Sequence, residues 1–214
     1  MAAEIAAAAA EDGAAVEIVT KIGEDGAGEE LLLALARARI GHLAVLRDPA
    51  WQTSLTADEG EPPDEDLDLV PALLAEAEAE AEAEAEAARR PLAGSRSASR
   101  SAPILEPADL TLALGYLRDY AVLVAVEPCA DGGAAVIAEA ASFVDAGLVV
   151  IAPAGLPVPA AYVAATLIEA PEDDPEGAFA ALVGRYAAAL DRGIAPAEAF
   201  RAATAEGGWN VAGD

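Results

Sequence analysis

The chain has 214 residues, of which 12 are Lys or Arg and 38 are Asp or Glu, giving a formal net charge of −26 at pH 7. Hydrophobic residues make up 55% of the chain, which is ample for a packed core and excludes collagen-like and wholly disordered classes. A charge of this size and sign repels phosphate backbones and anionic lipid, so we expect neither nucleic-acid nor membrane-surface binding.

The cysteine count and the N-terminal residues bear on the compartment. Cys129 is the single cysteine, so the chain cannot form an internal disulfide and a reducing cytoplasm is expected. Residues 1–10 contain Glu4 and no basic residue, unlike a signal peptide. The longest uncharged run, residues 146–168, contains three prolines, so it predicts a strand, a loop and a second strand rather than a membrane helix.

The first quarter of the chain predicts a helix and a strand–helix–strand unit. Residues 1–11 are rich in alanine and predict the first helix. Residues 16–20 alternate and are β-branched, which predicts a strand. A glycine-rich turn over 23–28 then precedes a helix over 29–39, and residues 42–47 predict a second short strand.

Residues 57–106 differ in composition from the rest and predict a low-complexity insert in a single domain spanning 1–214. Residues 75–88 alternate Ala and Glu, which favours a frayed helix because both residues are good helix formers and poor strand formers. Residues 89–101 read as a flexible basic, serine-rich linker. Replication slippage explains this insert more simply than an acidic interaction tail does.

Alternating strands and helices return after residue 104. Residues 109–120 predict a helix with Leu110, Leu114 and Leu117 on one side. The remaining elements are predicted as strands over 121–126, 148–152 and 164–169 and helices over 134–144, 178–190 and 195–205. This alternation predicts an α/β fold with a parallel sheet.

Three segments of the chain resemble the PfkB (ribokinase-like) carbohydrate kinase family. In residues 16–55, Gly23, Asp25 and Gly28 occupy the positions of the family's "vGxDxxG" turn. Residues 173–204 are similar to the family's "DTxGAGDAF" segment and the long helix that it opens, and residues 121–153 resemble the strand–helix–strand before a "NPAP"-like loop. The resemblance covers about two thirds of the chain through partial motifs. It implies an incomplete, Rossmann-like, three-layer ribokinase-type sheet, with Gly23 and Asp25 at substrate-binding positions.

The same resemblance implies a damaged catalytic centre. Gly177 stands where the family has its catalytic Asp, and Asp174, Pro175 and Glu176 replace the "GAG" of the anion hole. Glycine offers no proton acceptor, proline lacks an N–H donor, and the carboxylates place negative charge where phosphate would bind. Asp174 and Glu176 are the remaining candidates for a base. The family's first strand, with its sugar-binding Asp, would lie upstream of Met1.

We therefore expect a catalytically silent homologue that binds a small molecule or a partner. Two alternatives remain at this point. One is an active ATP-dependent sugar or nucleoside kinase with a truncated N-terminus, which would use ATP and Mg²⁺ as cofactors. The other is a non-enzymatic subunit that forms a homo-oligomer by burying an incomplete sheet edge. The acidic cluster at 172–176 reads as a solvated loop rather than a metal site.

Overall fold

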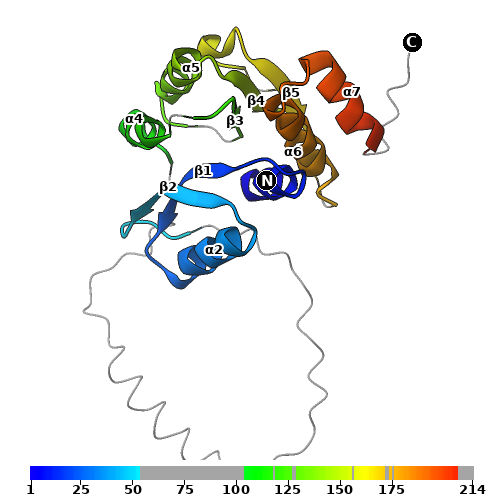
Figure 1. Ribbon diagram of the computed structural model, residues 1–214. Helices are drawn as coiled ribbons and strands as arrows, with labels where there is room; N and C mark the ends of the chain where they lie inside the picture. The colour runs from blue at the N-terminus through cyan, green and yellow to red at the C-terminus, as the bar shows by residue number, and fades with distance from the viewer. Residues whose placement is uncertain are drawn as a thin grey trace, which may run out of the picture. The chain divides into compact units, whose positions relative to one another are not determined.

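The computed structural model describes residues 1–53, 104–117, 119–126, 129–155, 157–171, 174 and 176–206 (Figure 1). The predicted insert lies outside these residues except for its last three. The elements are, in chain order, α1 (Ala2–Glu11), β1 (Glu17–Gly23), α2 (Gly26–Arg37), β2 (Gly41–Asp48), α4 (Pro107–Tyr116), β3 (Val122–Ala125), α5 (Gly133–Phe143), β4 (Gly147–Pro153), the 3-10 helix η1 (Ala160–Tyr162), β5 (Thr166–Ala170), α6 (Ala178–Asp191) and α7 (Pro196–Glu206).

All the strands pair in parallel, and they form two separate sheets within the described residues. One sheet has two strands in the order β1-β2, and the other has three in the order β3-β4-β5. The α/β class with parallel strands is therefore confirmed. The prediction of one sheet is wrong for the described part of the chain, because no backbone hydrogen bond there joins β1 to β3.

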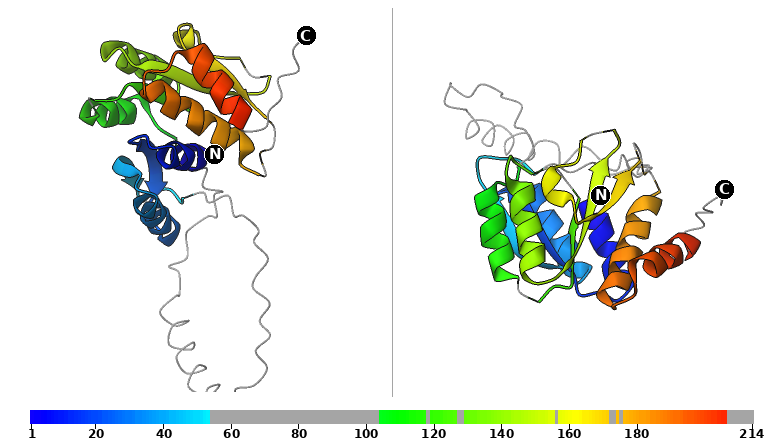
Figure 2. Two further views of the ribbon diagram at one scale, coloured as in Figure 1. Left: turned by 45° about the vertical axis from the view of Figure 1, so that its right-hand side comes forward. Right: turned by 90° about the horizontal axis from the view of Figure 1, so that it is seen from above.

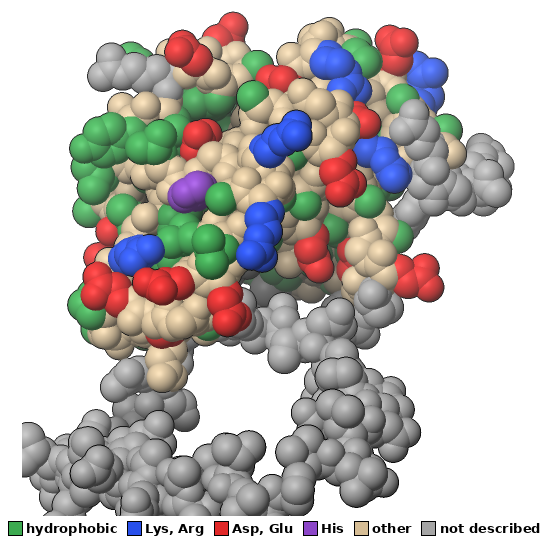
Figure 3. Space-filling view, turned by 60° about the horizontal axis from the view of Figure 1, so that its bottom comes forward, with side chains coloured by type: hydrophobic (Ala, Val, Ile, Leu, Met, Phe, Trp, Pro, Cys, Tyr) green, Lys and Arg blue, Asp and Glu red, His purple; other side chains and the backbone are tan. Residues whose placement is uncertain are grey.

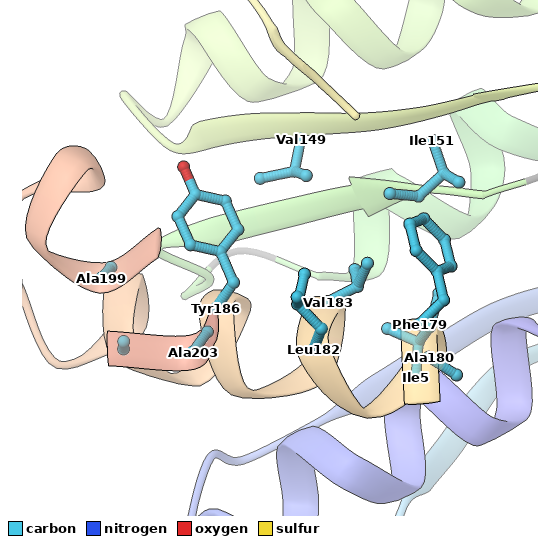
Figure 4. Close-up of a cluster of buried hydrophobic side chains, with 11 residues drawn as sticks. Ile5, Val149, Ile151, Phe179, Ala180, Leu182, Val183, Tyr186, Ala199 and Ala203 are labelled. Atoms are coloured by element: carbon cyan, nitrogen blue, oxygen red, sulfur yellow. The ribbon is translucent and has the colours of Figure 1, made fainter. Parts of the chain in front are cut away.

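Helices cover both faces of the three-stranded sheet. Val149 and Ile151 of β4 pack with Phe179, Val183 and the other buried residues of α6 (Figure 4). Val150, between them in the strand, points into a second cluster with residues of α4, α5 and η1. Because alternate residues of a strand face opposite sides, β4 is buried on both faces, as its unbroken apolar run predicts. Figure 2 shows the resulting layers.

Helix α1 lies against α6 through a close backbone approach. A Cβ atom added to Gly184 would lie 2.6 Å from the Cβ of Ala8 and 2.7 Å from the carbonyl oxygen of Ile5. Only a residue without a side chain fits this contact. Arg192, after the end of α6, also pairs with Asp12 at 3.1 Å, so the first helix is tied to the C-terminal part of the described chain.

The bounds predicted for two helices, 29–39 and 109–120, are wrong. Helix α2 begins at Gly26 rather than residue 29, because the Asp25 carboxylate accepts a hydrogen bond from the Gly28 N–H at 2.8 Å and so caps the helix earlier. Helix α4 ends at Tyr116, and Leu117 is already extended. The Tyr120 hydroxyl donates to the carbonyl oxygen of Ala140 at 3.2 Å, which holds the residues before β3 against α5 instead of in the helix.

β1 and β3 run in the same direction, because the carboxyl ends of both strands lie beside the start of α4. Lys21, near the end of β1, donates to Asp109 of α4 at 3.1 Å. Ala130, five residues beyond the end of β3, donates its N–H to the carbonyl oxygen of Leu105 at 3.1 Å. The two sheets therefore present two parallel strand edges to each other.

A cavity of about 800 Å³ lies between these two edges. Residues 16–21 and 121–126 form its long walls, with α1 and α6 on one side and α4 and α5 on the other. This hollow is open to solvent along part of its surface, and charged residues such as Glu17 and Asp191 contribute to its lining.

The uncharged run over 146–168 contains β4 and the start of β5, which confirms the two predicted strands, and η1 lies in the predicted loop between them; residue 156 is outside the described part. In the described residues, no helix has both the length and the apolar character that a membrane span requires.

Candidate functional site

The loop that enters α6 carries the residues which the sequence resemblance places at a phosphate site. Gly177 is the N-cap of α6 and has φ +64 and ψ 16, in the left-handed region that glycine adopts most easily. A Cβ atom at Gly177 would meet no atom within 4 Å, so backbone conformation rather than crowding favours glycine here. Gly177 brings no proton-accepting side chain to the start of the helix.

The Asp174 carboxylate occupies the first-turn amides of α6. Its Oδ1 atom accepts from the Phe179 N–H at 3.0 Å, and its Oδ2 atom accepts from the Ala180 N–H at 2.9 Å. Helix N-termini bind anions because their first N–H groups have no partner within the helix and the helix dipole is positive there. In this chain an internal carboxylate already takes that role.

The neighbouring site residues add little chemistry to this loop. Glu176 is exposed, and Pro175 lies outside the described residues. Both oxygens of Asp174 accept backbone hydrogen bonds, so this carboxylate serves as a helix cap. A further anion about 4 Å from it would be repelled by about 4 kcal/mol per unit charge at an effective dielectric constant of about 20. The arrangement stabilises α6 and disfavours a phosphate at the same position.

The turn after β1 brings Gly23, Asp25 and Gly28 together with a residue that the sequence did not single out, Thr53. Asp25 Oδ2 accepts from the Thr53 N–H at 2.7 Å, and the Thr53 hydroxyl oxygen accepts from the Gly23 N–H at 3.0 Å. A Cβ atom on Gly23 would lie 2.5 Å from the Trp51 carbonyl oxygen. Glycine is required here because the segment after β2 crosses directly over it.

This hydrogen bonding explains the acidity of Asp25. The N–H groups of Thr53 and Gly28, followed by the Thr53 hydroxyl, hold the pKa of Asp25 below its ordinary value by stabilising the charged form. Both carboxylate oxygens are thus engaged in capping α2 and fixing residue 53. The predicted substrate residue Asp25 has a structural task in this structure, and its oxygens point into the turn.

A charged cluster that sequence reasoning missed lies at the carboxyl ends of β1 and β2. Lys21 donates to Asp109 at 3.1 Å and lies 3.5 Å from Asp48, and only 14% of its side chain is exposed. The hydrogen bond to Asp109 is the largest cause of a raised Lys21 pKa, although burial opposes it. Burial raises the pKa of Asp109, but the hydrogen bonds from the Glu106 N–H and from Lys21 lower it by more. The pKa of Asp109 therefore lies below its usual value.

The signal for this cluster was weak in the sequence. Lys21 is the single lysine of the chain and directly follows the strand predicted over residues 16–20. Its partners Asp48 and Asp109 lie 27 and 88 positions further along the sequence, and only folding brings them to Lys21. In this cluster two carboxylates compensate the charge of one ammonium group, so the cluster holds α4 against β1 and β2 without requiring a ligand.

The structure offers no alternative metal centre within the residues it describes. No group of three or more His, Cys, Asp or Glu side chains there is placed to hold a metal ion, and residues 172 and 173 of the predicted acidic loop lie outside that part. The single histidine, His42, is exposed on β2, and hydrophobic side chains lie near it on the surface (Figure 3). On the same face, basic side chains lie among acidic ones.

Comparison with known proteins gives no independent assignment. No protein-family model matches the chain, and no curated protein has a significantly similar sequence.

Proposed function

We propose that this chain is a ribokinase-like homologue of the PfkB carbohydrate kinases that does not transfer phosphate, and that it acts by binding a small molecule or a partner. The proposal combines the partial motifs of the sequence with the α/β scaffold of parallel strands. Its ribokinase-type topology and its relation to the family are part of the proposal.

The observation that carries the proposal is the Asp174 carboxylate on the Phe179 and Ala180 amides. Phosphoryl transfer needs donors aimed at the charge on the transferring group and a base for the attacking hydroxyl. Asp174 itself accepts from two N–H groups in the first turn of α6, and Gly177 provides no base. The donors and the base are thus compromised together, at one end of one helix.

A phosphotransfer assay tests the proposal directly. The full chain is incubated with ATP, Mg²⁺ and a panel of sugars and nucleosides, and product is measured against a sample without protein. We expect no product above that background. The variants Asp174→Asn and Glu176→Gln are assayed in parallel, with Asp131→Asn, at an exposed aspartate before α5, as the matched control.

Robust turnover by the wild-type chain, lost in Asp174→Asn or Glu176→Gln and kept in Asp131→Asn, would show an active kinase and overturn the proposal. Turnover kept in all three variants would overturn it as well, and would place the base elsewhere in the chain.

A further inference from the structure

The cavity between the two sheets has the form of a vacant strand position. β1 and β3 run in the same direction and present their free edges to it, and within the described residues neither edge pairs with another strand. A strand edge offers a row of N–H and C=O groups, which require hydrogen-bonding partners when water is excluded. An acyl chain or an aromatic ligand would leave these groups without partners, whereas an extended peptide satisfies both rows.

The two sides of the cavity are as apolar as a central strand requires. Ile5, Ala6 and Ala188 line one side, and Leu110 and Ile137 line the other. Strands covered by helices on both faces read as continuous apolar runs, as β4 does in this molecule. The occupant that fits is therefore an apolar strand of about five residues, the common length of a strand in globular proteins.

The charges at one mouth of the cavity indicate the direction of that strand. Glu17 begins β1, Asp119 precedes β3, and Asp191 ends α6, and all three line the cavity together with Arg39. These three carboxylates against one guanidinium favour basic residues at this mouth. In a strand parallel to β1 and β3, the residues at this mouth are those that come before the apolar run.

We propose that this cavity binds an extended apolar segment of another polypeptide, preceded by basic residues, which adds as a parallel strand between β1 and β3 and joins the two sheets. This mode of recognition is β-strand addition at two edges at once. A strand inserted between β1 and β3 must have both of its edges free. No strand of the described part of this chain meets that condition, because each already pairs with a neighbour, so a folded second copy does not fit. The inference is independent of whether the chain transfers phosphate.

A synthetic peptide tests the proposal with the full-length protein. The probe is Lys-Lys-Leu-Val-Val-Ile-Ala, which carries the five central residues of β4, a strand buried on both faces in this fold. The matched control is the same peptide with N-methyl groups on alternate residues, which keeps the charge and the side chains but removes the N–H donors of one edge. We expect saturable binding of the probe in calorimetry, and binding of the control weaker by about tenfold or more.

Amide hydrogen exchange locates the bound peptide. The probe should slow exchange at residues 18–21 and 122–125, and the methylated control should not. Ala6→Phe, which places a ring in the cavity, should weaken probe binding. Ala36→Phe, at an exposed position of α2 outside the cavity, should leave it unchanged.

Several results would overturn the proposal. Equal binding of the two peptides would show an apolar hollow rather than a strand position, and so would binding without protection of β1 and β3. Absence of probe binding would also overturn it. The same amides could also become protected from hydrogen exchange without peptide, to an extent that rises with protein concentration. That result would assign the cavity to a second copy of the chain and refute the proposed partner.

Discussion

Replacing Asp174 by alanine removes the side chain that caps α6, and the structure sets the size of the effect. The change deletes two hydrogen bonds of 3.0 and 2.9 Å to backbone N–H groups and a negative charge at a helix N-terminus. Loss of such a cap costs about 0.5–2 kcal/mol, and the double contact places Asp174 in the upper part of that range, at about 1–2 kcal/mol. Since each kcal/mol shifts the melting temperature of a domain of this size by about 2–4 °C, we expect Asp174→Ala to melt about 2–8 °C lower.

Thermal unfolding followed by circular dichroism measures this shift, with Asp131→Ala as a control that removes an exposed carboxylate from a loop. The same variant frees the Phe179 and Ala180 amides for an external anion. Added sulfate should therefore raise the melting temperature of Asp174→Ala more than that of the wild-type chain. Equal melting of Asp174→Ala and Asp131→Ala, together with an equal response to sulfate, would refute the assignment of Asp174 as an internal anion.

Three further predictions concern the scaffold. Gly184→Ala forces α1 away from α6 and should lower the free energy of unfolding by about 1–3 kcal/mol in urea titrations. The control Gly115→Ala, in open space on α4, should raise it by about 0.5–1 kcal/mol. A change of the same sign in both variants would contradict the close packing of α1 on α6. The pKa of Asp25 is lowered in the folded state, so the ionised carboxylate stabilises the fold at pH values above its ordinary pKa of 3.8, and this stability is lost as the pH falls through the folded pKa. Asp25→Asn should therefore reduce the loss of stability at acid pH in a pH–stability curve. An unchanged loss in the variant would count against the hydrogen bonds of the turn. Burial raises the pKa of Tyr162 to about 12, so this hydroxyl ionises at lower pH in the unfolded chain than in the folded one, and stability should fall as the pH rises above 10. In an ultraviolet titration, Tyr162→Phe should lack the last tyrosine to ionise. Four tyrosines that titrate together in the wild-type chain would disprove the shift.

Local patterns in the sequence were sufficient to locate the secondary-structure elements. The β-branched alternation at Val16 and the apolar run at Leu148 both lie at strands, and Gly193, with φ +79, follows the end of α6 as a helix stop predicts. These features depend on neighbouring residues only. The glycines after Asp25 predict a turn and so misplace the start of α2, whereas the cap bond to Gly28 places Gly26 within the helix.

The pairing of strands could not be read from the sequence in the same way. Hydrogen bonding between strands depends on segments far apart in the chain, so the alternation of strands and helices predicts parallel pairing without saying where one sheet ends. For the same reason the contacts of Lys21 with Asp109 and of Asp25 with Thr53 were missed. The adverse charge of Asp174 was expected from its position, but its use as a cap for α6 required the folded loop.

The contact of α1 with α6 also constrains how the chain matures on the ribosome. Asp12 and Arg192, which join the two helices, are 180 positions apart. At about 5–20 residues per second, α1 leaves the ribosome about 9–36 s before its partner helix exists. During that interval its apolar face, with Ile5, has no native neighbour in α6 to cover it. Docking of the first helix must therefore be a late event in biosynthesis, and until then a chaperone can reach that surface.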